Sequence, residues 1–322
     1  MKAAVVTETG VEIREVPAPV PGPNHVLVRV RACGLNRADL GVAAGHKHGS
    51  IGGPGTIVGM EFAGEVVEVG AEVSAVKPGD RVMCSGAGAY AEYAVADWGR
   101  ATPIPASMSF EQAATLPVAL QTMHNALVTA GRLAAGESVL IQGASSGVGL
   151  MALQIAKHMG AALVIGTSTN AMRREKLKAF GADLAIDTTD PAWADAVLAA
   201  TGGKGVHLII DQVSASVANA NMKAARVLGR IVNVGRLGGA KGEFDYDLHA
   251  LKRIDYIGVT FRTRSIEEVR EINRRMRADL WGAIEAGTLR LPIDRSFPLA
   301  EAAAALAHMR ANMHFGKIVL SA

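Results

Sequence analysis

A run of small residues at positions 143–149 has the composition of a phosphate-binding turn. The apolar segment 139–142 leads into it, and apolar side chains then recur at helical spacing as far as Gly160. In such a turn, backbone amides and the partial positive charge of a helix N-terminus can approach a pyrophosphate. We expect dinucleotide binding by Gly143, Ala144, Ser145, Ser146, Gly147 and Val148. Because only Gly149 fits the strict GxGxxG pattern, an ordinary strand-to-helix turn is the alternative interpretation.

The end of the next strand indicates which dinucleotide fits. A site for NAD usually places Asp or Glu about 20 residues further on, where it binds the ribose hydroxyls. Residues 164–170 contain no acid and include Thr167, Ser168 and Asn170, and Arg173 follows. Hydroxyl, amide and guanidinium groups suit a 2′-phosphate, so we expect these four residues to bind NADP. The alternative, that the basic residues only solvate a helix face, stays open.

Two other nucleotide-binding patterns do not fit the sequence. Short-chain dehydrogenases need a tyrosine followed by lysine four residues later, and none of the four tyrosines has that lysine. The glycine-rich segment 202–205 lacks the spacing and the Ser or Thr of a phosphate loop for nucleoside triphosphates. Both interpretations are set aside.

The composition excludes several classes of protein. The chain has 322 residues, two cysteines, a net charge of +3 and 4% aromatic residues. Two cysteines cannot form a four-thiolate zinc site or a disulfide framework. The weak charge and few aromatics give no support to nucleic-acid binding. Since neither a signal peptide nor an apolar run of about 20 residues is present, we expect a cytoplasmic protein without membrane or nucleic-acid partners.

The elements that must position these residues fall into two groups. Short β-segments separated by glycine and proline fill residues 1–96 and predict a small barrel. From about residue 137, six apolar strands alternate with helical stretches, which predicts a parallel, doubly wound sheet. These strands are expected at residues 138–142, 162–167, 184–187, 206–211, 230–235 and 255–260. The tail should fold onto the first domain, with helices over 265–286 and 299–309, a segment of unassigned structure at 289–294 and a strand over 317–320.

Taken together, the chain resembles the medium-chain dehydrogenase/reductase superfamily, and within it the zinc-independent quinone oxidoreductases related to zeta-crystallin. The likeness covers nearly the full length and rests on residues 34–40, 58–64, 76–82, 90–93, 143–149, 260–265 and 315–320. It implies an α/β protein with a GroES-like β-barrel catalytic domain in residues 1–122, completed by 262–322. Residues 123–261 would form a Rossmann NADP-binding domain.

The same resemblance implies that no zinc is bound. Zinc alcohol dehydrogenases of the superfamily have a cysteine ligand where this chain has Asn36, a histidine where it has Met60, and a third ligand near Val118. An amide, a thioether and an isopropyl group cannot form a catalytic zinc site. The short connection from Cys84 to Tyr90 omits the lobe that holds structural zinc. We therefore expect no metal site.

The resemblance also implies the site residues. Asn36 is the leading catalytic residue, as an amide near the nicotinamide or the substrate oxygen, and Thr122 matches the family threonine near the nicotinamide. Further cofactor contacts are implied for Val234, Gly235, Phe261, Arg262 and Lys317. The structural alternatives are a turn residue for Asn36, a helix-facing hydroxyl for Thr122 and strand-end packing for the others.

The proton donor is not given by the resemblance. Many relatives have a tyrosine in the loop after the Asn36 motif, where this chain has Gly45, His46, Lys47 and His48. His46 or His48 could act as a general acid near neutral pH. A solvated loop, with protonation by water, is the alternative.

These features predict an NADPH-dependent oxidoreductase. Without zinc to stabilise an alkoxide, quinones and double bonds conjugated to a carbonyl are the easier hydride acceptors, because the developing oxyanion needs only hydrogen-bond donors. The alternative is an NADPH-binding protein with little turnover, used structurally or as a redox-responsive partner. Relatives commonly form homodimers by pairing edge strands, here residues 255–260, although a polar edge could equally be solvated.

Overall fold

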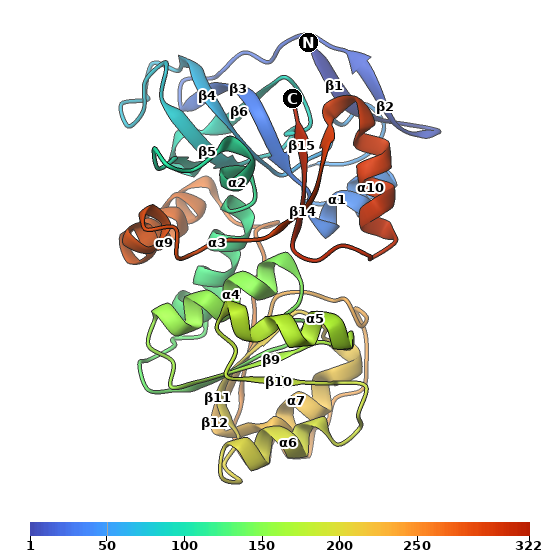
Figure 1. The fold of residues 1–322 in the computed structure, drawn as a ribbon, viewed down its shortest axis with the longest axis vertical. Coiled ribbons are helices and arrows are strands. Elements are labelled where there is room, and N and C mark those ends of the chain that lie inside the picture. The colour runs from blue at the N-terminus through green and yellow to red at the C-terminus, as the bar shows by residue number, and fades with distance from the viewer. Residues whose placement is uncertain (50) are drawn as a thin grey trace. The chain divides into compact units, whose positions relative to one another are not determined.

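The computed structural model describes residues 1–49 and 51–322, which form two compact units. The first unit comprises residues 1–121 and 261–322, and the second comprises residues 122–260. The first is therefore built from both ends of the described chain: in Figure 1, β15 (Lys317–Ser321) in red lies beside β3 (His25–Gly34) in blue. None of the helices formed by the described residues has the length and apolarity needed to cross a membrane.

A seven-stranded sheet forms the centre of the first unit. Its order is β14-β15-β3-β4-β5-β7, and β6 also pairs with β3. Along β3, buried Val28 and Val30 alternate with exposed Arg29 and Arg31, the period of a strand with one face in the core. The remaining strands are β4 (Glu61–Val69), β5 (Arg81–Ser85), β6 (Tyr93–Asp97), β7 (Ala101–Pro103) and β14 (Ile293–Pro298), with a separate hairpin of β1 (Lys2–Thr7) and β2 (Gly10–Glu15).

Helices complete the first unit. They are α1 (Arg37–Ala43), α2 (Phe110–Ala114), α9 (Ile266–Glu285) and α10 (Ala302–Arg310), and α3 (Pro117–His124) leads into the second unit. Residues 289–294, to which the sequence assigned no element, include the start of β14 at Ile293, where pairing with Lys317 begins. The N–H groups of Thr288 and Leu289 bond to the Ala283 carbonyl oxygen and belong to the end of α9.

The second unit is the predicted doubly wound parallel sheet. Its strand order is β10-β9-β8-β11-β12-β13, and every neighbouring pair is parallel. The strands are β8 (Ser138–Ile141), β9 (Leu163–Thr167), β10 (Leu184–Ile186), β11 (Val206–Asp211), β12 (Ala225–Asn233) and β13 (Asp255–Gly258). All four residues of β8 are buried, as expected for a strand covered on both faces.

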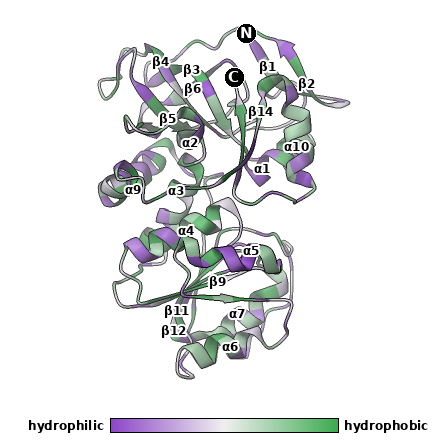
Figure 2. Cartoon of the chain, in the orientation of Figure 1, coloured by the Kyte–Doolittle hydropathy of each residue, from purple (hydrophilic) through white to green (hydrophobic). Residues whose placement is uncertain are grey.

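Helices cover both faces of this sheet. In Figure 1, α4 (Gly147–His158) and α5 (Ala171–Lys176) lie on one face, and α6 (Trp193–Ala200) and α7 (Ala218–Ala224) lie on the other. The last helix of the unit is α8 (Tyr246–Lys252). Figure 2 shows the central strands in the green of hydrophobic residues and α5 largely in purple, because α5 carries Arg173, Arg174 and Lys176. The α/β class and the doubly wound sheet are thus confirmed.

Candidate functional site

The turn between β8 and α4 is fixed by two glycines and a serine. Gly143 has a φ of +66°, and a Cβ atom on Gly149 would lie 2.6 Å from the Gly143 carbonyl oxygen. The Ser146 hydroxyl caps α4 by accepting a 3.1 Å hydrogen bond from the N–H of Gly149. The N–H groups of Gly147 and Val148 have no acceptor within the helix. They are the groups that an anion at this helix N-terminus would use.

Thr167, the last residue of β9, is hydrogen-bonded to the start of this turn. It is 1% exposed, and its hydroxyl donates to Gln142 Oε1 at 2.8 Å and accepts from the Gly143 N–H at 3.0 Å. Gln212 Nε2 donates to the Gln142 carbonyl oxygen, and the Ser146 hydroxyl donates to Gln212 Oε1, both at 3.1 Å. Since Thr167 bonds to the protein through both its donor and its acceptor, it holds the turn in place.

The polar residues predicted to bind a ribose phosphate gather after β9. The hydroxyls of Ser145 and Ser168 are hydrogen-bonded at 3.0 Å, which joins the turn to the end of the strand. Asn170 caps α5 by accepting a 3.0 Å hydrogen bond at Oδ1 from the Arg173 N–H. The structure thus brings Ser145, Ser168 and the start of α5 together.

The neighbouring arginine has a different task. Arg174 donates to the Ser168 carbonyl oxygen at 2.9 Å and pairs with Asp187 at 2.9 Å. Hydrogen bonds from the N–H and hydroxyl of Thr189, together with Arg174, hold the pKa of Asp187 below its usual range. Asp187 is therefore an ionised partner of Arg174.

The carboxyl ends of β11 and β12 are tied to each other. The N–H groups of Val234 and Gly235 donate to the Asp211 carbonyl oxygen at 2.7 and 3.2 Å. The buried Asp211 carboxylate accepts from the N–H groups of Val213 and Ser214, each at 2.8 Å. Burial raises the pKa of Asp211. Val234 and Gly235 consequently have a fixed backbone, as a surface for a flat cofactor requires.

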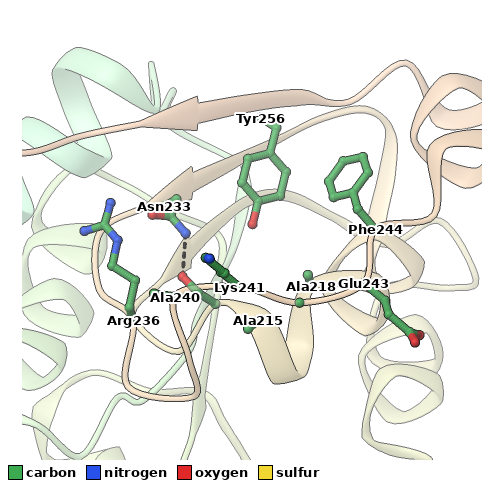
Figure 3. Close-up of a pocket in the computed structure, with 11 residues that line it drawn as sticks. Ala215, Ala218, Asn233, Arg236, Ala240, Lys241, Glu243, Phe244 and Tyr256 are labelled. Atoms are coloured by element: carbon green, nitrogen blue, oxygen red, sulfur yellow. Dashed lines mark hydrogen bonds between the residues drawn. The ribbon is translucent and has the colours of Figure 1, made fainter.

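A cavity of about 320 Å³ lies beside these strand ends. Asn233 of β12, labelled in Figure 3, donates a hydrogen bond to the Ser214 hydroxyl, and Ser214 has a φ of +66°. In the same view the Tyr256 hydroxyl and the Lys241 ammonium point into the space, whereas Glu243 points away. The lining is therefore mixed, with apolar residues such as Phe244 beside polar groups and a cation directed inward.

In the first unit, Asn36 lies in a buried network of charged groups. Its side-chain Nδ2 donates to Glu61 Oε1 at 2.8 Å, and its Oδ1 accepts from Lys317 Nζ at 3.0 Å. Lys317 and Glu61 form an ion pair at 2.5 Å, and they are 5% and 0% exposed. Glu61 Oε2 also accepts a 2.8 Å hydrogen bond from the Val118 N–H at the start of α3. Two predicted residues, Asn36 and Lys317, thus meet around Glu61, which the sequence reasoning missed.

A second carboxylate, that of Asp39, is hydrogen-bonded to the backbone of Asn36. Asp39 Oδ2 accepts hydrogen bonds from the Asn36 N–H at 2.7 Å and the Tyr90 hydroxyl at 2.8 Å. Burial raises the pKa of Asp39 to about 7, and burial with the Asp39 charge raises that of Tyr90. Asp39 therefore fixes the backbone of Asn36. The protonation of the Asp39 carboxyl group itself changes near neutral pH.

The other predicted residues lie apart from this network in their described contacts. Thr122 is half-buried in α3, and His46 is exposed on the loop after α1. Arg262 lies against the same loop, since a Cβ atom on Gly49 would be 3.4 Å from the Arg262 carbonyl oxygen. Burial and the Arg262 charge lower the pKa of His48. Phe261, next to Arg262, lies about 5.9 Å from the Arg264 guanidinium.

The ligand chemistry of the first unit does not suit a metal. Asn36 and Met60 offer an amide and a thioether, and Val118 offers no donor atom in its side chain. Within residues 1–49 and 51–322, no three His, Cys, Asp or Glu side chains are grouped so that they could hold a metal ion.

Two family models match the sequence. Residues 22–106 match "Alcohol dehydrogenase GroES-like domain", and residues 147–277 match "Zinc-binding dehydrogenase". Among curated proteins, the "Quinone oxidoreductase" of Rattus norvegicus is 32% identical over 311 residues, which are 95% of this chain and 92% of the relative. "Polyketide synthase GfsB" of Streptomyces halstedii is 34% identical over 302 residues, but the chain spans only 5% of that protein.

Solved structures are similar over the whole chain. The mycobacterial protein Rv1454c complexed with NADPH has a TM-score of 0.88 and 28% identity, with both chains fully covered. The CurK enoyl reductase has a TM-score of 0.86 and 25% identity, with 99% of each chain covered.

Proposed function

Because the chain belongs to the quinone oxidoreductase-like family of the medium-chain dehydrogenase/reductase superfamily, we propose that it transfers a hydride from NADPH to a small acceptor. The acceptor is a quinone or a carbon–carbon double bond conjugated to a carbonyl. The observation that carries the proposal is the Asn36 amide, which Lys317 and Glu61 hold in one orientation.

The residues of the second unit fit NADPH. The N–H groups of Gly147 and Val148 suit the pyrophosphate. Ser145, Ser168 and Arg173 suit the ribose phosphate, and the acid that usually selects NAD does not occur in residues 164–170. Val234 and Gly235 offer a fixed backbone surface. The NADPH complex of Rv1454c supports the same cofactor.

The residues of the first unit polarise the acceptor. Bound NADPH supplies the hydride, and its addition leaves a negative charge on the acceptor oxygen. The free N–H of the Asn36 amide donates to that oxygen and stabilises the charge as it forms. One proton then completes the reduction. We assign it to water, because His46 is exposed and has no described contact with Asn36.

The proposed chemistry needs no zinc. The donor atoms at Asn36 and Met60 are poor zinc ligands, and the nearby cation is an ammonium, Lys317. Elemental analysis of the dialysed protein should give far less than one zinc per chain. A stoichiometric zinc content would contradict this assignment.

Two further predictions are independent of the chemistry. A homodimer paired along β13, which is an edge strand of its sheet, and a cytoplasmic location remain predictions. Light scattering that shows a monomer at micromolar concentration would remove the dimer.

The test is NADPH oxidation with a panel of benzoquinones, naphthoquinones, cyclic enones and an enoyl thioester, with product analysis. A hydroquinone identifies a quinone as the acceptor, and a saturated carbonyl compound identifies the double bond. If NADPH binds tightly but no acceptor is reduced, the protein is a cofactor-binding protein and the proposal fails.

A further inference from the structure

The Lys317 ammonium has used all of its hydrogen-bonding capacity inside the protein. It donates to the Leu35 carbonyl oxygen at 2.6 Å, to Asn36 Oδ1 at 3.0 Å and to Glu61 Oε1 at 2.5 Å. A lysine ammonium has three N–H bonds, so none is left for a cofactor phosphate. The side chain is also 5% exposed. Its direct partners are therefore protein atoms.

These partners determine which way the Asn36 amide faces. An ammonium cannot accept a hydrogen bond, so the atom that faces Lys317 must be the amide oxygen. An ionised Glu61 carboxylate cannot donate, so the atom that faces it must be the amide nitrogen. A flipped amide would lose both contacts. One N–H of Nδ2 is bonded to Glu61, and the other has no partner among the described residues.

We propose that Lys317 and Glu61 are positioning residues that hold and polarise the Asn36 amide, so that its second N–H is the donor to the acceptor oxygen. The ammonium draws electron density from the amide through Oδ1, which makes the remaining N–H a stronger donor. The fixed cation of this site thus acts through Asn36 and does not touch the acceptor. The inference rests on the proposed function for the reaction that it serves.

The burial of the ion pair supports a role in the site. A buried Lys–Glu pair contributes little to the free energy of unfolding, because removing two charges from water costs about as much as their attraction returns. An apolar pair of similar volume often gives a protein of equal stability. Here the pair is also anchored to two segments that carry site residues. Glu61 accepts the Val118 N–H of α3, and Lys317 donates to Leu35, next to Asn36.

The experiment uses the neutral double variant Glu61→Gln/Lys317→Met. Either single change would leave a buried charge without its partner, and the resulting loss of stability would not report on the Asn36 amide. Circular dichroism and thermal melting establish that it folds. We expect the NADPH dissociation constant, measured by fluorescence, to stay within about twofold. The kcat should fall about ten- to a hundredfold, less than the full loss of an oxyanion donor.

A thermodynamic cycle with Asn36→Ala separates positioning from a general structural effect. If the pair acts through the Asn36 amide, adding Glu61→Gln/Lys317→Met to Asn36→Ala should lower kcat by no more than about twofold. If the loss of kcat in the combined variant equals the product of the two separate losses, the proposal is wrong. A large rise in the NADPH dissociation constant with kcat retained would also overturn it, since that would make Lys317 a cofactor ligand. Lys223→Met, which breaks an exposed ion pair with Asp195, is the matched control.

A readout without turnover distinguishes this inference from the proposed function. In the nitrogen-labelled wild-type protein, the Asn36 Nδ2 proton bonded to Glu61 should resonate downfield of the protons of solvated side-chain amides and should exchange slowly with water. In the double variant this signal should move toward the solvated range and its exchange should become faster. If wild type reduces no acceptor, the proposed function fails, while the NMR result still decides whether the pair orients the amide.

Discussion

The Tyr90 hydroxyl donates a 2.8 Å hydrogen bond to Asp39 Oδ2, and both side chains are fully buried. The second carboxylate oxygen, Oδ1, has no partner in the described part of the chain. A buried carboxylate in this setting is costly when ionised, and its pKa is raised to about 7. The Asp39 carboxyl group, which accepts the hydrogen bond from the Asn36 N–H, is therefore sensitive to pH.

Asp39 should make the folded protein less stable as the pH rises. The folded state binds the proton up to about pH 7, whereas the unfolded chain releases it near the usual 3.8. The free energy of unfolding should therefore fall across this window, by at most about 1.4 kcal/mol per pH unit. Asp39→Asn should remove this slope. Urea denaturation at a series of pH values measures it, and parallel profiles for the two proteins would contradict the prediction.

Gly149→Ala should disrupt the turn before α4. The new Cβ would lie 2.6 Å from the Gly143 carbonyl oxygen and 2.7 Å from the Ala144 Cα. We expect a loss of about 1–3 kcal/mol in stability and at least a tenfold weaker affinity for NADPH. Gly282→Ala is the control, because this helical glycine of α9 has open space around it. That change should stabilise the protein by about 0.5–1 kcal/mol.

Arg173→Ala should reduce the preference for NADPH over NADH. Hydrogen bonds to a charged phosphate contribute about 1.5–3 kcal/mol, so the NADPH dissociation constant should rise about ten- to a hundredfold. The NADH dissociation constant should not change, because NADH lacks the ribose phosphate. Titration calorimetry with both cofactors measures this, with Lys204→Ala as an exposed control. An equal loss for both cofactors would place Arg173 elsewhere in the site.

His46→Ala should leave the pH dependence of kcat unchanged. His46 lies on an exposed loop, and we assign delivery of the proton to water. We therefore expect kcat of the variant to stay within about threefold of wild type at every pH. Steady-state kinetics from acid to alkaline pH provides the measurement. A large fall in kcat, with loss of one limb of the pH profile, would instead identify His46 as the general acid.

Local patterns in the sequence were sufficient for the second unit. The strands β8 and β9 are short and largely apolar, and the turn at 143–149 follows directly from residues adjacent in the chain. The β14 strand was not assigned from the sequence: Leu289 and Leu291 before it have the alternation of a strand, yet the N–H of Leu289 belongs to the end of α9. Apolar spacing alone cannot distinguish these two cases.

The Asn36 network could be predicted only in part. Asn36 and Lys317 are each conspicuous, but they are 281 residues apart, and their contact depends on the pairing of β15 with β3. Glu61 gave one available signal: it is the first residue of β4 and stands beside an apolar pair, Phe62 and Ala63, where an acid must have a partner. The sequence does not state which residue that partner is.

Lys317 also sets the order in which the site can assemble on the ribosome. The 256 residues between Glu61 and Lys317 take tens of seconds to synthesise at about 5–20 residues per second. The second unit is complete by residue 260 and can fold in that interval. Until residue 317 is made, the nascent first unit holds Glu61 without the ammonium that pairs with it in the folded protein. A chain that stalls before residue 317 should therefore leave the first unit incompletely folded, with Asn36 lacking its contact with Lys317.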